Sequence, residues 1–428
     1  MQLISFLKKD FVKNVMTLIT GSVFSQLIIY AALLVLTRLF SRELFGVYVL
    51  FSSAILILKP IVSLQLDLAV VLPKRNKDAV NIFVLSVIIL FILNLFLFGG
   101  IFIFKEKIIT FFKIEKLSNF IYLLPLASFF FGFTQTLNYW NNRIKSFKNI
   151  AKGNIIKASF LSTTQIITGA SYFNSLGLIP GMILGQIMQV VFLYFNTYKT
   201  LIKYKKHLSF KRMFFLFKKY KDIPLFNTLI NFSNSLSNEI PVIMITRYFG
   251  LNFSGVYGLA LKVGRAPLGV TEDSVSQVFF NKATETYNNK GDLYALIKKT
   301  FYHLIKIGVI IFIPILAISF FLDIIFGKNW SEVGLYLRIL SPWLFIAFLT
   351  GPITSLISIF NKQKVFLLLN LLLLVFRFFA FYIGNHVFKD ILVSLILFSA
   401  VGVIFNTFTL TYFIRTSKLK TDKKIAYQ

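Results

Sequence analysis

The segment "TRLFSRELFGVY", Thr37–Tyr48, recurs 209 positions later as "TRYFGLNFSGVY", Thr246–Tyr257, and this repetition decides the organisation of the chain. Six of the twelve aligned positions are identical without a gap, including the closing Gly-Val-Tyr of each copy. Both copies join two long apolar stretches. Their Gly permits a tight turn, Arg can anchor at lipid headgroups, and Tyr suits the membrane–water interface. The repetition therefore marks two similar halves and carries no catalytic signature.

The composition is that of a membrane protein. Of 428 residues, 57% are hydrophobic and only 14% are charged, with a mean hydropathy of +0.76, whereas soluble domains are about 25% charged. In lipid, such a chain must satisfy its backbone groups internally, which favours helices. Lys8, Lys9 and Lys13 precede the first apolar stretch and no small-residue cleavage site follows it, so we expect a retained first helix.

The apolar stretches between charged or turn-rich breaks predict twelve membrane-spanning helices, since about 20 residues cross a bilayer. The predicted fold is an all-α integral membrane protein with two parallel six-helix lobes. The expected spans are 15–37, 44–71, 79–104, 119–140, 153–173, 176–198, 223–246, 252–280, 295–321, 335–360, 365–385 and 390–413.

The basic residues predict the orientation of these spans. With the N-terminus in the cytoplasm, cytoplasmic segments hold 30 of the 46 Lys and Arg, outer loops hold 10, and spans hold the other 6. The threefold inner excess follows the positive-inside rule, so both termini are expected in the cytoplasm. The net charge of +30 is thus explained by topology and by affinity for anionic lipid, and we expect no nucleic-acid partner.

The repeated segment lies between spans 1 and 2 and again between spans 7 and 8. An offset of six spans is even, so the halves share one orientation, as in a parallel repeat about an axis along the membrane normal. We expect an N-terminal six-helix lobe at 1–198 and a C-terminal lobe with a basic cytoplasmic tail at 223–428. The basic, aromatic linker at 199–222 is predicted to lie on the inner leaflet as an amphipathic helix.

Six basic residues fall within the predicted spans: Lys59, Lys157, Lys262, Arg265, Lys306 and Arg377. A charge at the bilayer centre costs roughly 2.5–3.5 kcal/mol and is a functional candidate. Lys157 and Lys306 lie within about 10–15 Å of cytoplasmic helix ends, so snorkelling explains them. Lys59, Arg265 and Arg377 lie about 20 Å from a helix end, near the midplane.

Prolines accompany two of these cations. Lys59 precedes Pro60, and Arg265 lies two residues before Pro267, at counterpart positions of the two halves. Proline frees a carbonyl four residues back, and such breaks are tolerated where a helix lines a cavity. Lys262 shares the helix face of Arg265. The cations either bind an anionic substrate or pair with acids and carbonyls for structure, and Asp67 and Glu239 are the main acids within spans.

The seventh span contains the second unusual pattern. Asn227, Asn231, Asn234 and Asn238 lie within about 60° of one helical face. Such amides either hydrogen-bond neighbouring helices or line a wet cavity that binds a hydroxyl-rich ligand. Glu239 adjoins this stripe, two residues before Pro241, and is a candidate for H⁺ or Na⁺ coupling; the alternative is a structural pair with Lys262 or Arg265.

Other chemistry is not indicated by the sequence. It has no cysteine, which excludes disulfides, thiolate metal sites and cysteine nucleophiles. It has no phosphate-binding G-x-x-x-x-G-K-[ST] motif, and His207, His303 and His386 are scattered. We therefore expect no enzyme activity, no catalytic residue, no metal and no organic cofactor.

Several stretches resemble the polysaccharide repeat-unit flippases, the Wzx type, of the MATE-like multidrug/oligosaccharidyl-lipid/polysaccharide exporter superfamily. They are "KNVMTLITGSVFSQ" from Lys13, "LTRLFSRELFGVYVLF" from Leu36, "LAVVLPKRNKDA" from Leu68, and "GVYGLALKVGRAPLGVTEDSVSQVFFNKATE" from Gly255. The resemblance spans nearly the whole chain and implies a V-shaped transporter with two six-helix lobes.

The resemblance also implies a function. Such a protein moves an undecaprenyl-pyrophosphate-linked oligosaccharide from the inner to the outer leaflet of the bacterial cytoplasmic membrane, for O-antigen, lipopolysaccharide or capsule synthesis. Cavity cations that hold the pyrophosphate are a family feature, which we assign to Lys59, Lys262, Arg265 and Arg377 by depth and repeat position. The expected partners are this glycan lipid, membrane lipids and a polysaccharide polymerase, and the chain is expected to be a monomer.

Two other functions are compatible with a membrane protein of this kind. A drug-cation antiporter of the same fold would need an acidic cavity, and the predicted charge has the opposite sign. A membrane polysaccharide polymerase or glycosyltransferase is disfavoured by the short outer loops and the parallel repeat. The sugar composition and the driving ion do not follow from the residues.

Overall fold

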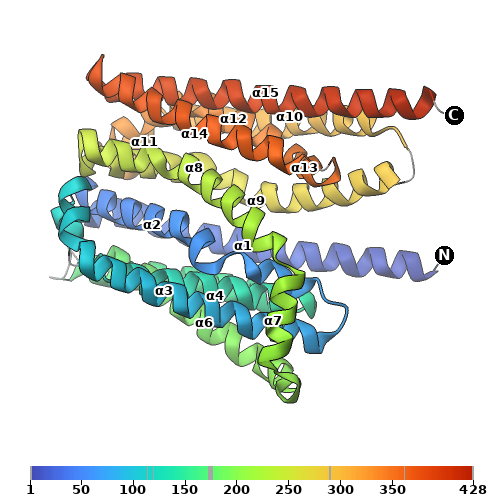
Figure 1. Cartoon of the computed structure of the whole chain (residues 1–428). Coiled ribbons are helices and arrows are strands. Elements are labelled where there is room, and N and C mark those ends of the chain that lie inside the picture. Colours follow the sequence, from blue (N-terminus) through green and yellow to red (C-terminus); the bar gives the residue numbers. More distant parts are fainter. Residues whose placement is uncertain are drawn as a thin grey trace. The chain divides into compact units, whose positions relative to one another are not determined.

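The computed structural model describes residues 2–112, 114–118, 120–171, 177–288, 291–360 and 362–426. Side chains are described between 16 and 418, chiefly without those of 267–275. All regular secondary structure in these ranges is helical (Figure 1). The predicted all-helical membrane fold class is therefore confirmed.

Twelve long helices of the described chain coincide with the twelve expected spans. Their bounds are α1 Gln2–Leu39, α2 Arg42–Ser63, α3 Asn76–Phe112, α4 Leu123–Arg143, α5 Phe147–Ala170, α6 Leu178–Ile202, α8 Thr228–Phe249, α9 Leu251–Asn288, α10 Leu293–Ile318, α12 Glu332–Thr350, α14 Gln363–His386 and α15 Ile391–Ala426. Eight segments of the described chain are long and apolar enough to cross a membrane by length and composition alone. The other four, α4, α5, α8 and α9, are long enough but carry more polar residues.

Short elements connect the long helices. They are the 3₁₀ helices η1 Leu66–Val71, η2 Glu115–Leu117, η4 Lys205–His207, η6 Lys328–Trp330 and η7 Pro352–Ser355, the π-helical turn η5 Ile223–Asn227, and the α-helices α7 Phe210–Lys219, α11 Leu322–Phe326 and α13 Leu356–Ile359.

The second span ends earlier than its hydropathy predicts. Helix α2 continues through Pro60 but stops at Ser63, because Leu64 and Gln65 both have left-handed backbones, with φ of 47° and 51°. Each left-handed non-glycine residue costs about 1–3 kcal/mol and persists only where its surroundings hold it. Here the Ser63 hydroxyl accepts a hydrogen bond from the Gln65 amide at 3.1 Å, and the chain then enters η1.

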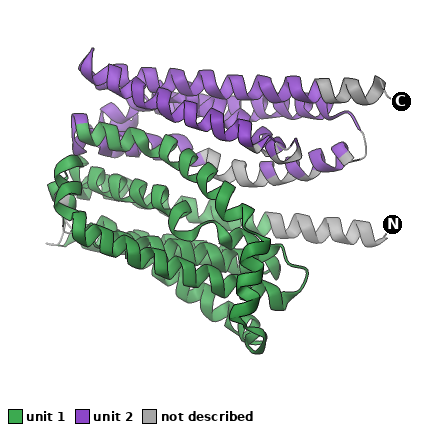
Figure 2. Cartoon of the chain, viewed as in Figure 1, with its two compact units in different colours: residues 1–247 green, residues 248–428 purple. Residues whose placement is uncertain are grey.

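The chain forms two compact units, residues 1–247 and 248–428 (Figure 2). In the first unit α2 packs against α3 and α4, α3 against α4, and α6 against α4 and α5. In the second unit α9 packs against α10 and α12, α10 against α12, and α15 against α12 and α14. These are the same five pairings when spans 2–6 are matched in order with spans 8–12. The repeat seen in the sequence is therefore also a repeat of helix packing.

The unit boundary differs from the predicted lobe boundary. Helix α8, the seventh span, falls almost entirely within the first unit, because η5 before it contacts η1 and its side chains bond to α2 and to Gln65. The lobe limits at 198 and 223 remain a sequence-based prediction.

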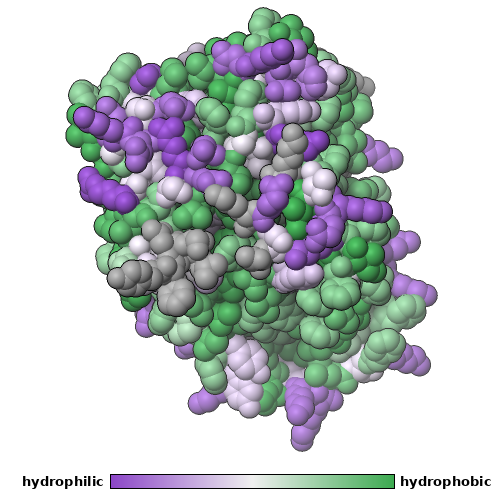
Figure 3. Space-filling model, turned by 90° about the vertical axis from the view of Figure 1, so that its left-hand side faces the viewer, coloured by the Kyte–Doolittle hydropathy of each residue, from purple (hydrophilic) through white to green (hydrophobic). Residues whose placement is uncertain are grey.

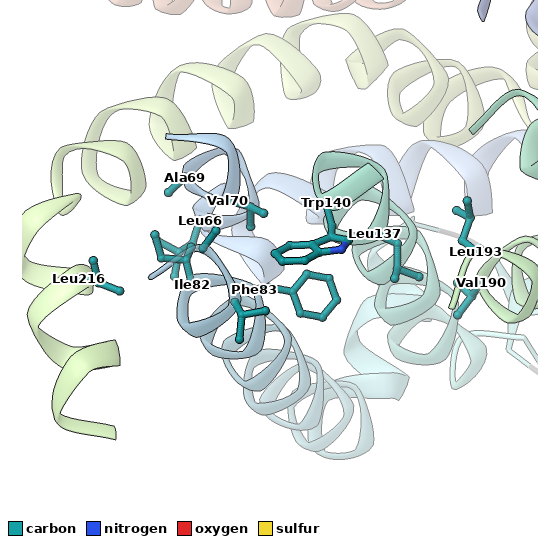
Figure 4. Packing of buried hydrophobic residues seen from close by; sticks show 12 residues of the cluster. Leu66, Ala69, Val70, Ile82, Phe83, Leu137, Trp140, Val190, Leu193 and Leu216 are labelled. Atoms are coloured by element: carbon teal, nitrogen blue, oxygen red, sulfur yellow. The ribbon is translucent and has the colours of Figure 1, made fainter. Parts of the chain in front are cut away.

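A buried apolar cluster organises one end of the first unit. Trp140 of α4 meets Phe83 of α3 with ring centroids 5.9 Å apart, and Leu66 and Val70 of η1 join them (Figure 4). Leu216 of α7 belongs to the same cluster. The apolar side of η1 is thus fixed between α3, α4 and α7.

The predicted amphipathic linker contains such a helix. Helix α7 buries Met213 and Leu216 while the rest of its side chains are exposed or partly exposed. Figure 3 shows the side that lies on the left in Figure 1, away from α7, and hydrophilic residues lie among apolar ones there as well. Large apolar side chains elsewhere in the described chain, such as Phe96 and Phe195, are also exposed, as expected for surfaces that face lipid.

Candidate functional site

Glu239 lies inside the first unit, where α8 meets α2. Its carboxylate Oε2 accepts a hydrogen bond from the Ser53 hydroxyl at 2.6 Å, and both residues are buried. The short serine side chain can bond to a neighbouring helix only where the two helix backbones lie close together. Small residues allow such close packing in membrane proteins. The candidate coupling carboxylate is therefore held by α2 of the same unit. Ser53 was not singled out from the sequence.

Lys59 has charged neighbours inside the first unit. It interacts electrostatically with Asp67 of η1 and with Lys157 of α5. Asp67 is buried, and its Oδ1 has no hydrogen-bond partner among the described side chains and backbone. The structure thus places Asp67, one of the two acids considered as partners of the span cations, near Lys59. The proximity of Lys157 to Lys59 was not predicted from the sequence. Lys157, interpreted as snorkelling, lies near Lys59 as well.

The asparagine stripe of α8 divides into two parts. Asn231 donates to Oε1 of Gln65, the left-handed residue after α2, at 3.3 Å. Asn238 donates to Asn234 along the same helix at 3.2 Å, and Asn234 is exposed within its unit. Asn227 ends the π-helical turn and is partly buried. Asn231 therefore bonds to a neighbouring element, whereas Asn234 and Asn238 form an exposed amide pair.

In the second unit two of the predicted cations meet at one aromatic ring. The guanidinium carbon of Arg265 lies 5.6 Å from the ring centroid of Trp343, and that of Arg377 lies 5.0 Å from it. Cation–π attraction is worth about 0.5–1 kcal/mol when exposed and about 2 kcal/mol or more when desolvated. Trp343 of α12 therefore offsets the repulsion between two like charges from α9 and α14.

The two arginines differ in burial. Arg377 is only 1% exposed, and its guanidinium also lies 4.6 Å from the centroid of Phe398. Arg265 is partly buried, as is Lys262, one turn earlier on α9. Of the three cations proposed to bind substrate in this unit, Arg377 is interior, whereas Arg265 and Lys262 are partly accessible. Lys306 of α10, interpreted as snorkelling, is exposed.

The packing around Trp343 leaves little room for adjustment. Its ring lies 5.0 Å from Phe398 in a T-shaped contact, and Gly402 of α15 lies against its edge. A Cβ at Gly402 would approach Cδ1 of Trp343 to 2.4 Å. The ring position, and with it the arginine arrangement, is set by close contact between helices. Neither Trp343 nor Gly402 carries a sequence signal that distinguishes it from other apolar or small span residues.

Outside the spans, Arg143 and Arg212 hold the end of the first unit together. Arg143 donates to the carbonyls of Val70 and Val71, each at 3.2 Å. Arg212 of α7 donates through two nitrogens to Asp78, both at 2.9 Å. These hydrogen bonds raise the pKa of Arg212 above its ordinary value. Among the described residues, no group of three His, Cys, Asp or Glu is placed to hold a metal ion.

The polysaccharide biosynthesis protein family matches residues 35–334 of the sequence. The chain belongs to this family. The match includes both copies of the repeated segment and the residues Lys59, Glu239 and Arg265. Among curated proteins, none matches the sequence.

The fold of this polysaccharide biosynthesis protein resembles solved transporters of the MOP superfamily. An inward-facing multidrug resistance MATE transporter aligns with a TM-score of 0.70 at 14% identity, over 96% of this chain and 95% of that chain. A MATE protein in a bent conformation gives 0.61 at 16% identity, over 98% and 96%. A MOP transporter from Pyrococcus furiosus, described as having a binding pocket of reverse polarity that suggests a different function, gives 0.58 at 15% identity, over 96% of both chains. At such low identity these similarities show the fold.

Proposed function

We propose that this protein is a flippase that moves a polyprenyl-pyrophosphate-linked oligosaccharide from the inner to the outer leaflet of the bacterial cytoplasmic membrane. The family membership supplies the link to polysaccharide synthesis, and the fold is that of transporters that span the membrane many times. The glycan would serve a surface polysaccharide such as O-antigen or capsule, with both termini of the chain in the cytoplasm.

The observation that carries this proposal is the pairing of Arg265 and Arg377 at Trp343. Two guanidinium groups within one helix bundle of a membrane protein are costly unless they serve an anion or a structural pair. A pyrophosphate carries charge of the opposite sign, and arginine forks match phosphate oxygens in two-point hydrogen bonds. Arg265, with Lys262 on the same face, would contact the pyrophosphate, while the buried Arg377 would add long-range positive potential.

The amides support the sugar part of the proposal. Asn234 lies exposed on α8 and bonds Asn238 along the helix. An exposed amide pair offers donors and acceptors suited to sugar hydroxyls. Asn227 and Asn231 would contribute on the same helix, with Asn231 already bonded to Gln65. Lys59 would provide a cation in the first unit.

The proposed energy source is an ion gradient, because the sequence carries no nucleotide-binding motif. Alternating access needs a group whose charge or coordination changes between states. Glu239 is our candidate, since it is a buried acid of α8 that is hydrogen-bonded to Ser53 of α2.

Deletion of the gene tests the function directly. Lipid-linked repeat units are expected to accumulate on the inner leaflet, measured by extraction and by their resistance to impermeant glycan-binding reagents in intact cells. The proposal is supported if the native chain, but not the Arg265→Ala variant, restores transport and removes this accumulation. Accumulation of shorter, incomplete glycans instead would indicate a glycosyltransferase, and a normal lipid-linked pool with lost drug resistance would indicate a drug antiporter.

A further inference from the structure

Helix α7 presents an apolar ridge beside two lysines. Phe210 and Phe214 are 81% and 55% exposed and lie one helical turn apart, so they share a face. The ammonium of Lys218 lies 4.6 Å from the Phe214 ring centroid, and Lys211 is exposed on the same side. We call these four residues the α7 ridge.

The opposite side of α7 is anchored to the first unit. Met213 and Leu216 are buried, and Leu216 packs in the cluster with Phe83 and Trp140. Arg212 holds Asp78 of α3 through two hydrogen bonds at 2.9 Å. Because one side is anchored by both packing and charge, the direction in which the ridge points is fixed relative to this unit.

The chain segment around the ridge is strongly basic. Residues 203–221 contain eight Lys and Arg and no Asp or Glu. The three residues of η4, just before α7, are exposed and basic. A short helix with aromatic rings on one side and lysines beside them lies at the headgroup level of a membrane, and its lysines attract anionic lipid.

We propose that the α7 ridge binds the headgroups of anionic phospholipids in the leaflet next to this helix. Phe210 and Phe214 enter the boundary between headgroups and acyl chains, and Lys211 and Lys218 contact the phosphates. Exposed phenylalanines favour lipid over a nucleic acid, because their burial in the acyl boundary removes apolar surface from water. The proposal is independent of the transported substrate.

The experiment uses the full-length protein in vesicles of equal phosphatidylglycerol and phosphatidylcholine. Since the chain has no cysteine, Phe210→Cys can be labelled uniquely with a bimane ring in place of the phenyl ring. Bromines placed on either lipid then report which one lies at the probe. We expect phosphatidylglycerol to quench more strongly, with an enrichment of about fivefold for each lysine at the surface. Equal quenching by both lipids would overturn the proposal.

Matched charge removals test the role of the lysines. In the double variant Lys211→Gln/Lys218→Gln, the enrichment of phosphatidylglycerol over phosphatidylcholine at the probe is expected to fall close to one. Lys74→Gln/Lys77→Gln removes two exposed lysines, one just before α3 and one in its first turn, and is expected to leave the phosphatidylglycerol enrichment unchanged. Equal loss in both pairs would mean that net charge, and not the ridge, selects the lipid.

Salt gives a test that requires no lysine substitution. Raising the ionic strength screens exposed charges, so the preference for phosphatidylglycerol should fall. A preference that is insensitive to salt contradicts the proposal. Disulfide cross-linking between copies of Phe210→Cys before labelling would show that a second copy covers the ridge, and would likewise contradict it.

Discussion

The hydroxyl of Ser53 in α2 donates a hydrogen bond to the carboxylate of Glu239 in α8 at 2.6 Å, although the two residues are 186 positions apart in the chain. Both side chains are buried. The hydrogen bond fixes the carboxylate between α8 and α2. A change in how these two helices pack would therefore change the surroundings of this acid.

Glu239→Gln should separate coupling from binding. The glutamine keeps the shape and an acceptor for Ser53 but cannot gain or lose a proton. We expect folded protein that still binds lipid-linked glycan but whose flipping no longer responds to an imposed proton or sodium gradient in proteoliposomes. Ser53→Ala, which retains the carboxylate, is the control and should keep a gradient response. A native response from Glu239→Gln would exclude Glu239 as the coupling group.

Arg265 and Arg377 should respond differently to substitution. Arg265→Ala is expected to abolish surface glycan with normal protein levels, and Arg265→Lys to retain part of the activity because the charge remains. Arg377 is buried and lies over the rings of Trp343 and Phe398, so Arg377→Lys should retain part of the activity through its charge but lose stability with the planar group.

Surface glycan per unit of inserted protein, measured by glycan staining and immunoblotting, checks both arginines. Arg377→Ala should also lower the free energy of unfolding of the purified protein by about 2 kcal/mol, whereas Arg265→Ala should change this free energy less. Full activity of both alanine variants at normal expression would show that these cations are structural.

The close contact at Gly402 predicts a change in stability. Gly402→Ala places a methyl group 2.4 Å from Cδ1 of Trp343, so the ring must move at a cost of about 1–3 kcal/mol. Gly99→Ala is the matched control, because a Cβ there meets nothing within 4 Å and alanine favours a helix interior by about 1 kcal/mol. Melting temperatures in detergent should therefore shift in opposite directions. An unchanged melting temperature for Gly402→Ala would contradict the packing at Trp343.

Cysteine labelling checks the topology. Ser41→Cys and Asn252→Cys, exposed at the two repeated hairpins, are expected to react with an impermeant thiol reagent outside intact cells. Asn76→Cys and Ser209→Cys, also exposed, should react only after the membrane is opened. Labelling of the second pair from outside would reverse the predicted orientation.

The sequence by itself determined the membrane class, the twelve long helices and the duplication. Hydropathy and charge can be read over the length of a single helix. The apolar stretches and the repeated segment that ends in Tyr48 and Tyr257 could therefore be recognised without information on contacts between distant residues. The linker helix α7 follows for the same reason, since its basic and aromatic residues form a local pattern. The membrane depths of Lys59, Arg265 and Arg377 remain a prediction, based on the distance of each residue from the end of its helix.

Only the tertiary structure decided which side chains meet. The sequence does not indicate that Arg265 and Arg377 both lie over the Trp343 ring, or that Ser53 bonds Glu239, because these contacts join separate helices. The early end of α2 at Ser63 was also missed, since Leu64 and Gln65 have no intrinsic preference for a left-handed backbone. Their conformation is imposed by the packing of η1 against α3 and α4, and such packing depends on the surfaces of several helices at once.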